Sequence, residues 1–261
     1  MHFKPKKRLG QNFLIDKNIQ RKIIDCLELK FSDIVLEIGA GRGELTWFIA
    51  GGVNKAYALE IDAALCRTLK VNLKDYSNAE IINQDVLNLN FRKYFGKLKN
   101  KIKVFGNIPY YISSSIIEYL IKFRDKIEVI FITVQKEFAK RITAVPGSKV
   151  YGAFSCFVQY YFEPKIILNI KKTCFLPKPK VDSCLVRLGV LKLPRVRPKD
   201  EKLFFKVIRA AFSKRRKTLR NSLSGIISLQ KLDKFFNKNS IDSNIRPEDL
   251  SLEDFANLSD V

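Results

Sequence analysis

Histidine is almost absent from this sequence, whose 261 residues include only one, His2. A single histidine near the N-terminus argues against hydrolysis by a Ser or Cys nucleophile with a His base, and against zinc sites built on His ligands. We therefore expect the chemistry of this protein to proceed without histidine and without a bound metal.

Cysteine pairs and long apolar segments are also lacking. No apolar segment approaches the roughly 20 residues that a membrane-spanning helix requires. The basic N-terminus is not followed by the apolar stretch of a secretory signal. The cysteines have no C-x-x-C spacing and are odd in number, which favours reduced, partly buried thiols in a cytoplasmic protein. They are Cys26, Cys66, Cys156, Cys174 and Cys184.

Positive charge, by contrast, is in large excess. The chain contains 48 Lys and Arg residues and 26 Asp and Glu residues, a formal net charge of +22. Hydrophobic residues make up 46% of the chain, which is enough for a folded core and argues against a disordered basic tail. A folded protein with this charge is expected to bind a polyanion, either nucleic acid or an anionic membrane surface. Composition does not distinguish the two.

Short apolar segments alternate with helical patterns along the first part of the chain. This alternation predicts an α/β fold with a parallel sheet. Two later apolar segments, 160–170 and 181–191, are interpreted as a final hairpin. The predicted strands cover 33–39, 55–60, 80–85, 102–105 and 128–134, and helices between them cover 43–49, 63–73 and 113–121.

The composition changes at Leu193-Pro-Arg-Val-Arg-Pro198, where prolines and arginines follow one another. We place a domain boundary there, which divides the chain into residues 1–194 and 195–261. Helical periodicity over 200–223 and a short acidic helix over 246–256 predict that the C-terminal domain is small and all-α.

A glycine-rich turn, Glu37-Ile-Gly-Ala-Gly-Arg-Gly43, follows the first predicted strand. Glycines there let the backbone approach a ligand above a helix N-terminus, although the G-x-G-x-G spacing differs from that of dehydrogenases. Glu60 ends the second strand, where a carboxylate can bind both ribose hydroxyls of a nucleoside. Asp85 ends the third, within reach of an adenine amino group. These three strand ends predict a nucleoside-binding site.

The segment Asn107-Ile-Pro-Tyr110 follows the fourth predicted strand and has an unusual composition. The side-chain oxygen of Asn107 and a carbonyl at Pro109 can accept both hydrogens of an adenine N6 amine, while Tyr110 stacks on the ring. Accepting both hydrogens frees the nitrogen lone pair to attack an electrophilic methyl group. The segment therefore predicts methyl transfer to an adenine outside the base stack, without a histidine base.

Together these segments resemble the ribosomal RNA adenine N6-dimethyltransferase family, and most closely its bacterial branch that acts on the small ribosomal subunit. The likeness extends from Lys7-Arg-Leu-Gly-Gln-Asn-Phe-Leu14 through the motifs above to 175–183 and 211–223. It implies a Rossmann-like sheet of an S-adenosylmethionine-dependent methyltransferase, followed by the small all-α domain.

The resemblance also implies a reaction and its residues. S-adenosylmethionine would donate two methyl groups to N6 of each of two adjacent adenosines in the 3′-terminal hairpin loop of 16S rRNA. The expected partner is 16S rRNA in the small ribosomal subunit, and the protein is expected to be a cytoplasmic monomer. Phe175 would form a second stacking wall opposite Tyr110, beside the catalytic Asn107 and Pro109. The implied donor-binding residues are Asn12, Leu14, Gly39, Glu60, Asp85 and Asn107.

Two basic segments are expected to contact RNA phosphates, because clustered Lys and Arg side chains are the electrostatic footprint of nucleic-acid binding. One lies near the N-terminus and the other in the C-terminal domain. The residues are Lys6, Lys7, Arg8, Lys214, Arg215, Arg216, Lys217 and Arg220.

Rival functions remain open at this point. The large-subunit rRNA adenine methyltransferase of the macrolide-resistance type shares the Asn-Ile-Pro-Tyr loop, but the segment 212–223 resembles the small-subunit enzyme more closely. DNA adenine methyltransferases usually carry two prolines in the corresponding motif. A non-catalytic RNA-binding factor for ribosome assembly is a different class. The intact Asn107, Pro109 and Tyr110 argue against a loss of catalysis, but they leave a second role in assembly open.

Overall fold

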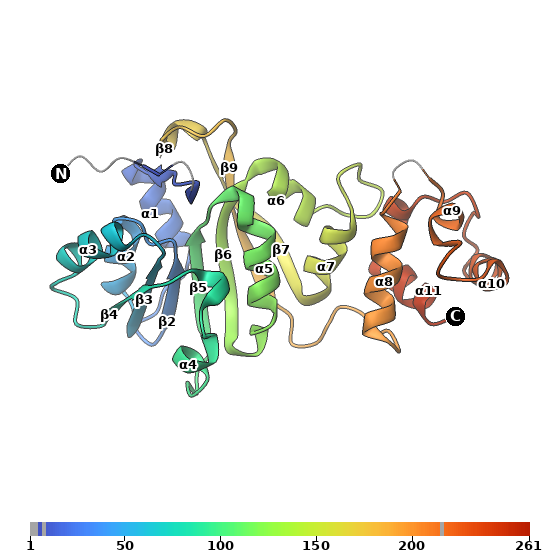
Figure 1. Ribbon diagram of the computed structural model, residues 1–261, viewed down its shortest axis with the longest axis horizontal. Coiled ribbons are helices and arrows are strands. Elements are labelled where there is room, and N and C mark those ends of the chain that lie inside the picture. The colour runs from blue at the N-terminus through green and yellow to red at the C-terminus, as the bar shows by residue number, and fades with distance from the viewer. Residues whose placement is uncertain (1–4, 7–8, 215–216) are drawn as a thin grey trace. The chain divides into compact units, whose positions relative to one another are not determined.

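The computed structural model describes residues 5–6, 9–214 and 217–261. They form two compact units, each described here by itself (Figure 1). The first unit comprises the chain up to residue 139 together with 165–190, and the second comprises 140–164 and 191–261. The segment 140–164 is thus grouped with the C-terminal helices. The functional division into 1–194 and 195–261 stays a prediction.

A seven-stranded sheet forms the centre of the fold, in the order β4-β3-β2-β5-β6-β9-β7. The strands from β2 to β6 pair in parallel, whereas β9 runs antiparallel to β6. The predicted parallel α/β sheet is therefore confirmed, and the two late apolar segments are indeed neighbours as β7 and β9. The strands are β2 Ile34–Ile38, β3 Lys55–Glu60, β4 Ala79–Asn83, β5 Ile102–Asn107, β6 Ile127–Gln135, β7 Phe162–Ile170 and β9 Ser183–Val190.

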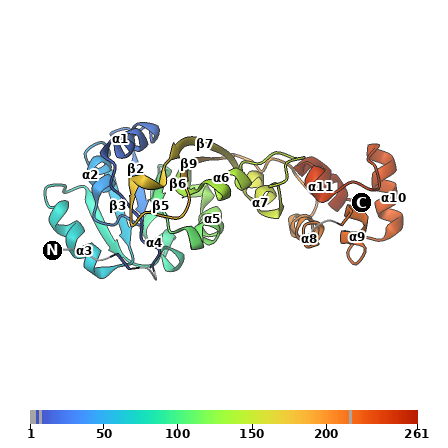
Figure 2. The same ribbon diagram turned by 90° about the horizontal axis from the view of Figure 1, so that it is seen from above.

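Helices cover both faces of the sheet, with α1 and α2 on one face and α5 on the other (Figures 1 and 2). Asp16 and Asp62 begin α1 and α3 by accepting hydrogen bonds from backbone N–H groups of the first turn. Apolar residues of α1 and α2 pack with Phe105 and Phe131 of the sheet to form a core. The helices are α1 Lys17–Cys26, α2 Glu44–Ala50, α3 Ala63–Asn72, α4 Phe91–Phe95, α5 Ser113–Ile121 and α6 Lys136–Ile142. Short 3-10 turns are η2 Val86–Asn88, η3 Tyr110–Ile112, η4 Arg124–Lys126 and η5 Lys172–Cys174.

Two very short strands, β1 Phe13–Leu14 and β8 Phe175–Leu176, join segments that are distant in the sequence. They pair antiparallel and place Leu14 opposite Phe175. The sequence patterns did not predict this pairing, since two residues are too few to produce a recognisable period. The pairing fixes the N-terminal segment beside the main sheet.

The second unit is helical. The predicted continuous pattern over 200–223 is interrupted: α8 ends at Ala211, and α9 begins after Thr218, whose hydroxyl accepts a hydrogen bond from a first-turn N–H. The carboxylate of Glu201 accepts hydrogen bonds from Tyr160 at 3.0 Å and Tyr161 at 2.7 Å, which joins α7 to α8. The elements are α7 Ala153–Tyr161, α8 Glu201–Ala211, α9 Leu219–Leu223, α10 Leu229–Asn239, η6 Pro247–Asp249 and α11 Leu252–Ser259.

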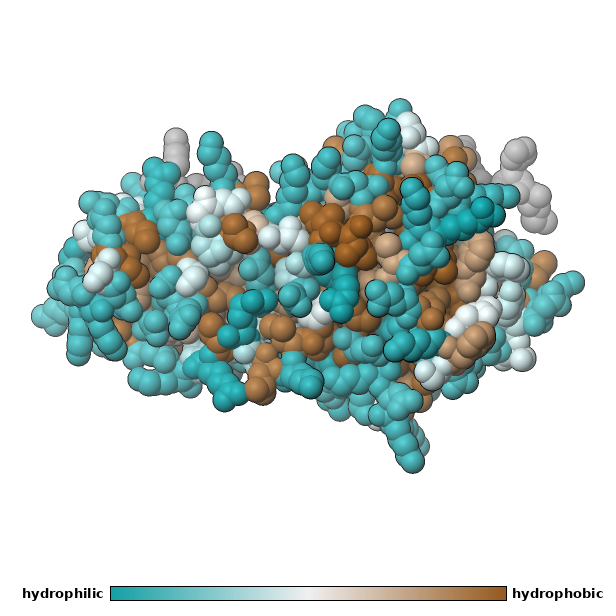
Figure 3. Space-filling view, turned by 180° about the vertical axis from the view of Figure 1, so that it is seen from behind, coloured by the Kyte–Doolittle hydropathy of each residue, from teal (hydrophilic) through white to brown (hydrophobic). Residues whose placement is uncertain are grey.

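Polar and apolar side chains are mixed on the surface. Figure 3 shows hydrophobic side chains in separate patches between larger hydrophilic areas.

In the described parts of the chain, no helix combines the length and apolar character needed to cross a membrane. Four of the five cysteines are buried and Cys26 is partly buried, as predicted.

Candidate functional site

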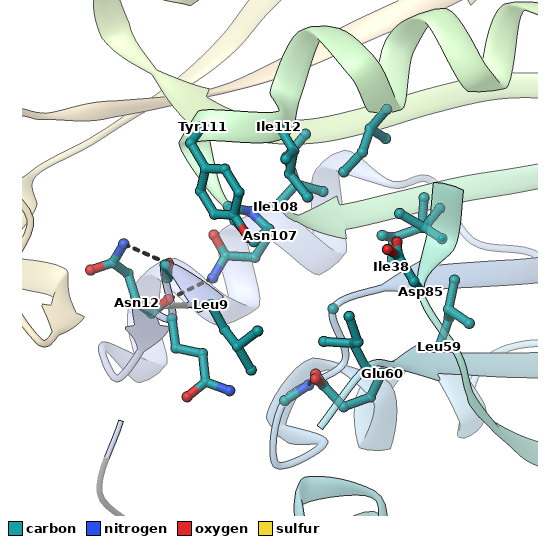
Figure 4. A pocket seen from close by; sticks show the side chains of 18 of the residues that line it. Leu9, Asn12, Ile38, Leu59, Glu60, Asp85, Asn107, Ile108, Tyr111 and Ile112 are labelled. Carbon is teal, nitrogen blue, oxygen red and sulfur yellow. Dashed lines mark hydrogen bonds between the residues drawn. The ribbon is translucent and has the colours of Figure 1, made fainter. Parts of the chain in front are cut away.

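A cavity of about 280 Å³ opens at the carboxyl ends of the central parallel strands. The chain leaves β2 toward β3 on one side and leaves β5 toward β6 on the other, so the connections of these two neighbouring strands diverge and leave a crevice between them. Residues after β2, β3, β4 and β5 line the cavity, together with the N-terminal segment 9–13 (Figure 4). Among the predicted residues, those that line it are Asn12, Gly39, Glu60, Asp85, Asn107, Pro109 and Tyr110.

The glycine turn after β2 forms part of the cavity wall with bare backbone. Gly39 and Gly41 have φ angles of +73° and +62°, which side chains rarely tolerate. A Cβ atom on Gly41 would also lie 3.3 Å from the ring of Phe13. Glycine is therefore required here both by the conformation and by the close approach of Phe13.

Glu60 lies at the end of β3, where it is almost fully buried. One carboxylate oxygen accepts the N–H of Gly41 and the other accepts the N–H of Asp62, both at 2.9 Å. Burial raises the pKa of Glu60, and these two hydrogen bonds oppose the rise. Each oxygen retains a further lone pair, so the carboxylate can also accept two hydroxyl hydrogens from a ligand.

Asp85 follows β4, which ends two residues earlier at Asn83, and it begins the turn η2. Its Oδ1 accepts the N–H of Leu87 at 2.9 Å, whereas Oδ2 accepts no hydrogen bond from the described residues. In Figure 4, Glu60 and Asp85 lie toward one side of the cavity, and Asn12 and Asn107 lie toward the other. An elongated ligand can therefore contact both groups.

Asn107 is oriented by the N-terminal segment. Its side-chain Nδ2 donates a hydrogen bond to the main-chain carbonyl of Asn12 at 3.0 Å (Figure 4). The side chain of Asn12 donates in turn to the carbonyl of Gly10 at 3.2 Å. Because the amide nitrogen of Asn107 is bound in this way, its side-chain oxygen is the end available to accept a hydrogen from a ligand.

Tyr110 is held by a residue that the sequence motifs did not single out as functional. Its hydroxyl lies 2.6 Å from the hydroxyl of Ser183, a fully buried residue at the start of β9. Burial raises the pKa of Tyr110, with the hydrogen bond to Ser183 acting in the opposite sense, so the phenol is neutral near pH 7. The only available sequence signal was the position of Ser183 in the segment that resembles the family.

The N-terminal segment is tied to the cavity edge by Asp62, a second residue that sequence reasoning missed. Lys6, predicted to contact RNA, forms an ion pair with Asp62 at 2.8 Å. The side chain of Gln11 donates to the same carboxylate at 3.4 Å. Burial acts to raise the pKa of Asp62, but the hydrogen bonds from Lys6 and others hold it below its usual value. Contact of Lys6 with RNA stays a prediction, and in this structure its charge is paired.

Leu14 and Phe175 lie behind the cavity. Leu14 lines a smaller hollow of about 30 Å³ with Gly39 and Asn107. Phe175 is only 2% exposed, packs in the core, and is not among the residues lining the large cavity with Tyr110. Its role as a second stacking wall stays a prediction that requires a movement of β8 or of the ligand toward it.

The remaining predicted RNA contacts that the structure describes belong to the second unit. Lys214 and Lys217 are exposed, whereas Arg220 forms an ion pair with Asp233 at 2.8 Å. The other predicted contacts, Lys7, Arg8, Arg215 and Arg216, lie outside the described residues. Across the described part of the chain, no cluster of three or more His, Cys, Asp or Glu side chains is arranged to hold a metal ion.

Comparison with known proteins identifies the family. The family described as "Ribosomal RNA adenine dimethylase" matches residues 2–261. The chain belongs to this family. A relative from Clostridium acetobutylicum, named "Ribosomal RNA small subunit methyltransferase A", is 42% identical over 99% of this chain and 94% of its own length. A protein of the same name from Alkaliphilus metalliredigens is 42% identical over 98% of this chain and 91% of its own length.

Solved structures share the family fold. A dimethyladenosine transferase from Plasmodium falciparum has a TM-score of 0.77 and 26% identity, over 94% of this chain and 95% of that chain. The 23S rRNA methyltransferase ErmE has a TM-score of 0.76 at 23% identity, over 95% of this chain and 98% of that chain. This last likeness concerns the fold alone. The predicted Rossmann-like methyltransferase sheet is thereby confirmed.

Glu37 is a buried acid within the glycine-rich segment of this family member, and it was not predicted as a site residue. It is 3% exposed and accepts a hydrogen bond from the hydroxyl of Thr46 at 2.5 Å. Burial raises the pKa of Glu37 from 4.5 to about 8. Glu37 also lines the small hollow beside Gly39 and Asn107.

The wild-type protein is expected to lose stability as the pH rises, and replacement of Glu37 by Gln is expected to abolish this loss. The folded protein keeps a proton on Glu37 up to pH about 8, whereas the unfolded chain releases it near 4.5. Unfolding therefore releases a proton between these values, and the free energy of unfolding falls by up to about 1.4 kcal/mol per pH unit. The stabilisation of the folded protein by protonated Glu37 is fully present below pH 4.5 and is lost above pH 8. Urea unfolding at pH 6 and 8.5 measures it.

The matched control for this prediction is Glu118→Gln, on the exposed surface of α5. With a single histidine in the chain, few other side chains titrate in this pH range. The control should follow the pH dependence of the wild type. If Glu37→Gln also followed it, the buried acid would not titrate as described.

Proposed function

We propose that this protein dimethylates N6 of two adjacent adenosines in the 3′-terminal hairpin loop of 16S rRNA, within the small ribosomal subunit. S-adenosylmethionine is the proposed methyl donor. The assignment to the small subunit is supported by the relatives of that name at 42% identity along nearly the whole chain. We further propose that the protein acts as a monomer in the cytoplasm, where its substrate is assembled.

The residues of the cavity fit this donor. Backbone at Gly39 and Gly41 leaves room that side chains would fill, and Glu60 offers two oxygens to a ribose diol. The free Oδ2 of Asp85 suits the amino group of an adenine. Gly39 would lie beside the methionine part, and Asn12 and Leu14 would contact the donor from the N-terminal segment. When bound, S-adenosylmethionine supplies an electrophilic methyl group.

The orientation of Asn107 is the observation that carries the proposal. Its Nδ2 is committed to the carbonyl of Asn12, so its Oδ1 accepts one hydrogen of the target N6 amine. The carbonyl of Pro109 is the proposed acceptor of the other hydrogen, in place of the N–H of Ile112 at 3.3 Å and the hydroxyl of Ser113 at 3.4 Å that it accepts here. Tyr110, whose hydroxyl is held by Ser183, supports the adenine ring. These acceptors stabilise the positive charge that develops on nitrogen during methyl transfer. The chain thus activates the amine without a histidine base.

The helical unit is the proposed RNA-binding part, through Lys214 and Lys217. Replacing both by Gln is expected to lower the slope of log Kd against log salt by about 1.4 to 1.8, since each lost phosphate contact removes about 0.7 to 0.9. Binding to small subunits across a salt series measures the slope. The control variant replaces Lys234 and Lys238, which are exposed on α10 and carry the same charge. Equal slopes for the two variants would show that the change reflects net charge and not phosphate contacts made by Lys214 and Lys217.

One experiment tests the proposed function directly. The protein is incubated with labelled S-adenosylmethionine and either unmethylated small subunits or large subunits, and the modified base is mapped. We expect label only in the small subunit, on two adjacent adenosines near the 3′ end of 16S rRNA. Label confined to the large subunit would support the macrolide-resistance type of activity, and binding without label would support a non-catalytic assembly factor.

A further inference from the structure

A groove on the first unit, outside the large cavity of the candidate site, combines an aromatic ring with cationic side chains. It lies between α1, α2 and the C-terminal end of α3, and it has a volume of about 660 Å³. Trp47, Lys17, Arg21 and Arg42 line it. None of these residues was assigned a role by the motifs or by the proposed reaction.

Trp47 is the only tryptophan of the chain, and it is 49% exposed on the surface of α2. Phe48 and Tyr76 make edge contacts with its ring, with ring centroids 5.1 and 5.9 Å away. These contacts fix the orientation of the indole while about half of its surface stays open. A large, fixed and half-exposed aromatic ring is suited to stacking with a planar ligand.

The charges of the groove favour an anionic ligand. Lys17 and Arg21 lie one turn apart on α1, are exposed, and form no ion pair within the described residues. Among the described residues, Glu44 is the one acid that lines the groove, and Arg42 pairs with it at 2.8 Å. The two free cations on α1 are thus left to bind phosphate groups beside Trp47.

The groove is continuous with the candidate site. Arg42 lies over the ring of Phe13, 5.1 Å from its centroid, and Phe13 lines the cavity that contains Asn107. Glu44 lines both the groove and the small hollow beside Asn107. A strand that presents an adenosine to Asn107 can therefore continue across Phe13 and Arg42 to Trp47.

We infer that Trp47 stacks on an unpaired base of the substrate RNA near the target adenosines, with Lys17 and Arg21 bound to the adjoining phosphates. This inference rests on the proposed function and adds a substrate subsite to it. Stacking on an aromatic side chain accepts any base, so the subsite contributes affinity and register and leaves the choice of the methylated base to the Asn107 pocket.

The single tryptophan provides a direct readout. A hairpin RNA with the 3′-terminal loop of 16S rRNA is titrated into the protein at low salt, and tryptophan fluorescence is followed. We expect saturable quenching, with a midpoint equal to the Kd measured by an independent binding assay. A fully paired RNA duplex should bind with little quenching, because it offers no unpaired base. Equal quenching by vesicles of anionic lipid would overturn the inference in favour of a membrane surface.

Substitutions test the energetic contribution of the subsite. Trp47→Ala is expected to weaken hairpin binding about tenfold, because it removes one base stack, and Trp47→Phe should retain most of the affinity. Lys17→Gln with Arg21→Gln should weaken binding and lower its salt dependence. Lys22→Gln, on the same helix but outside the groove, is the control.

The possible failures are distinguishable. If the wild type methylates small subunits and binds the hairpin without a change in fluorescence, or if Trp47→Ala binds with wild-type affinity, the inference is wrong and the proposed function stands. If the wild type neither binds the hairpin nor methylates small subunits, the proposed function is wrong and the subsite is lost with it.

Discussion

Replacement of Asn107 by Ala is expected to lower the rate of methyl transfer by roughly 100-fold or more, the loss typical of removing one preorganised hydrogen-bonding group from a transition state. The truncated side chain cannot accept a hydrogen of the N6 amine, so the nitrogen lone pair is less available to the methyl group. Labelled methyl transfer under single-turnover conditions measures the effect, because product release does not contribute there.

The variant Asn107→Asp tests the orientation of the side chain separately from its ability to accept a hydrogen bond. Aspartate keeps two acceptor oxygens but loses the donor that binds the carbonyl of Asn12 at 3.0 Å. One carboxylate oxygen would then face another acceptor, and the side chain is expected to turn away. We therefore expect this variant to lose activity to a similar extent, with RNA affinity largely retained in both. Transfer at the wild-type rate by either variant would rule out the role assigned to Asn107.

Replacement of Lys103 by Ala is expected to reduce the free energy of unfolding by about 3–5 kcal/mol, as is typical when one partner of a buried ion pair is removed. Lys103 lies in β5, and its Nζ is 2.8 Å from a carboxylate oxygen of Asp33, with side-chain exposures of 8% and 10%. The same ammonium donates to the carbonyl of Glu28 at 2.7 Å, just beyond the end of α1. Without Lys103, the carboxylate of Asp33 keeps the N–H of Lys30 as a hydrogen-bond donor but has no cation beside it among the described residues. Urea unfolding monitored by circular dichroism measures the change.

Two further variants test whether the unpaired charge causes this loss. Lys103→Met combined with Asp33→Asn removes both charges, while the new amide oxygen can still accept the N–H of Lys30. This double variant should be clearly more stable than Lys103→Ala. The control is Lys55→Met, which breaks the partly exposed pair with Glu80 and should cost at most about 1 kcal/mol. Equal losses for Lys55→Met and Lys103→Ala would show that burial of the pair is unimportant.

The sequence alone determined most of the central sheet and the residues that surround the cavity. Buried parallel strands are short continuous apolar segments, and the ends of these segments mark where functional side chains gather. For this reason Gly39, Glu60, Asp85 and Asn107 could be placed at one sheet edge before any contact was known. Their roles could be proposed from chemistry, because amide and carboxylate oxygens at these strand ends can accept hydrogen bonds from the hydroxyl and amino groups of a ligand.

The tertiary structure alone decided how those side chains are held. The hydrogen bond from Asn107 to Asn12 spans 95 residues, and that from Tyr110 to Ser183 spans 73. Contacts over such separations leave no local period, and neither does the two-residue pairing of Leu14 with Phe175. Lys6 likewise belongs to a basic run by its sequence but is bound to Asp62 in the fold. Local patterns specify which groups reach the site, whereas packing between distant segments specifies which atom of each group faces the ligand.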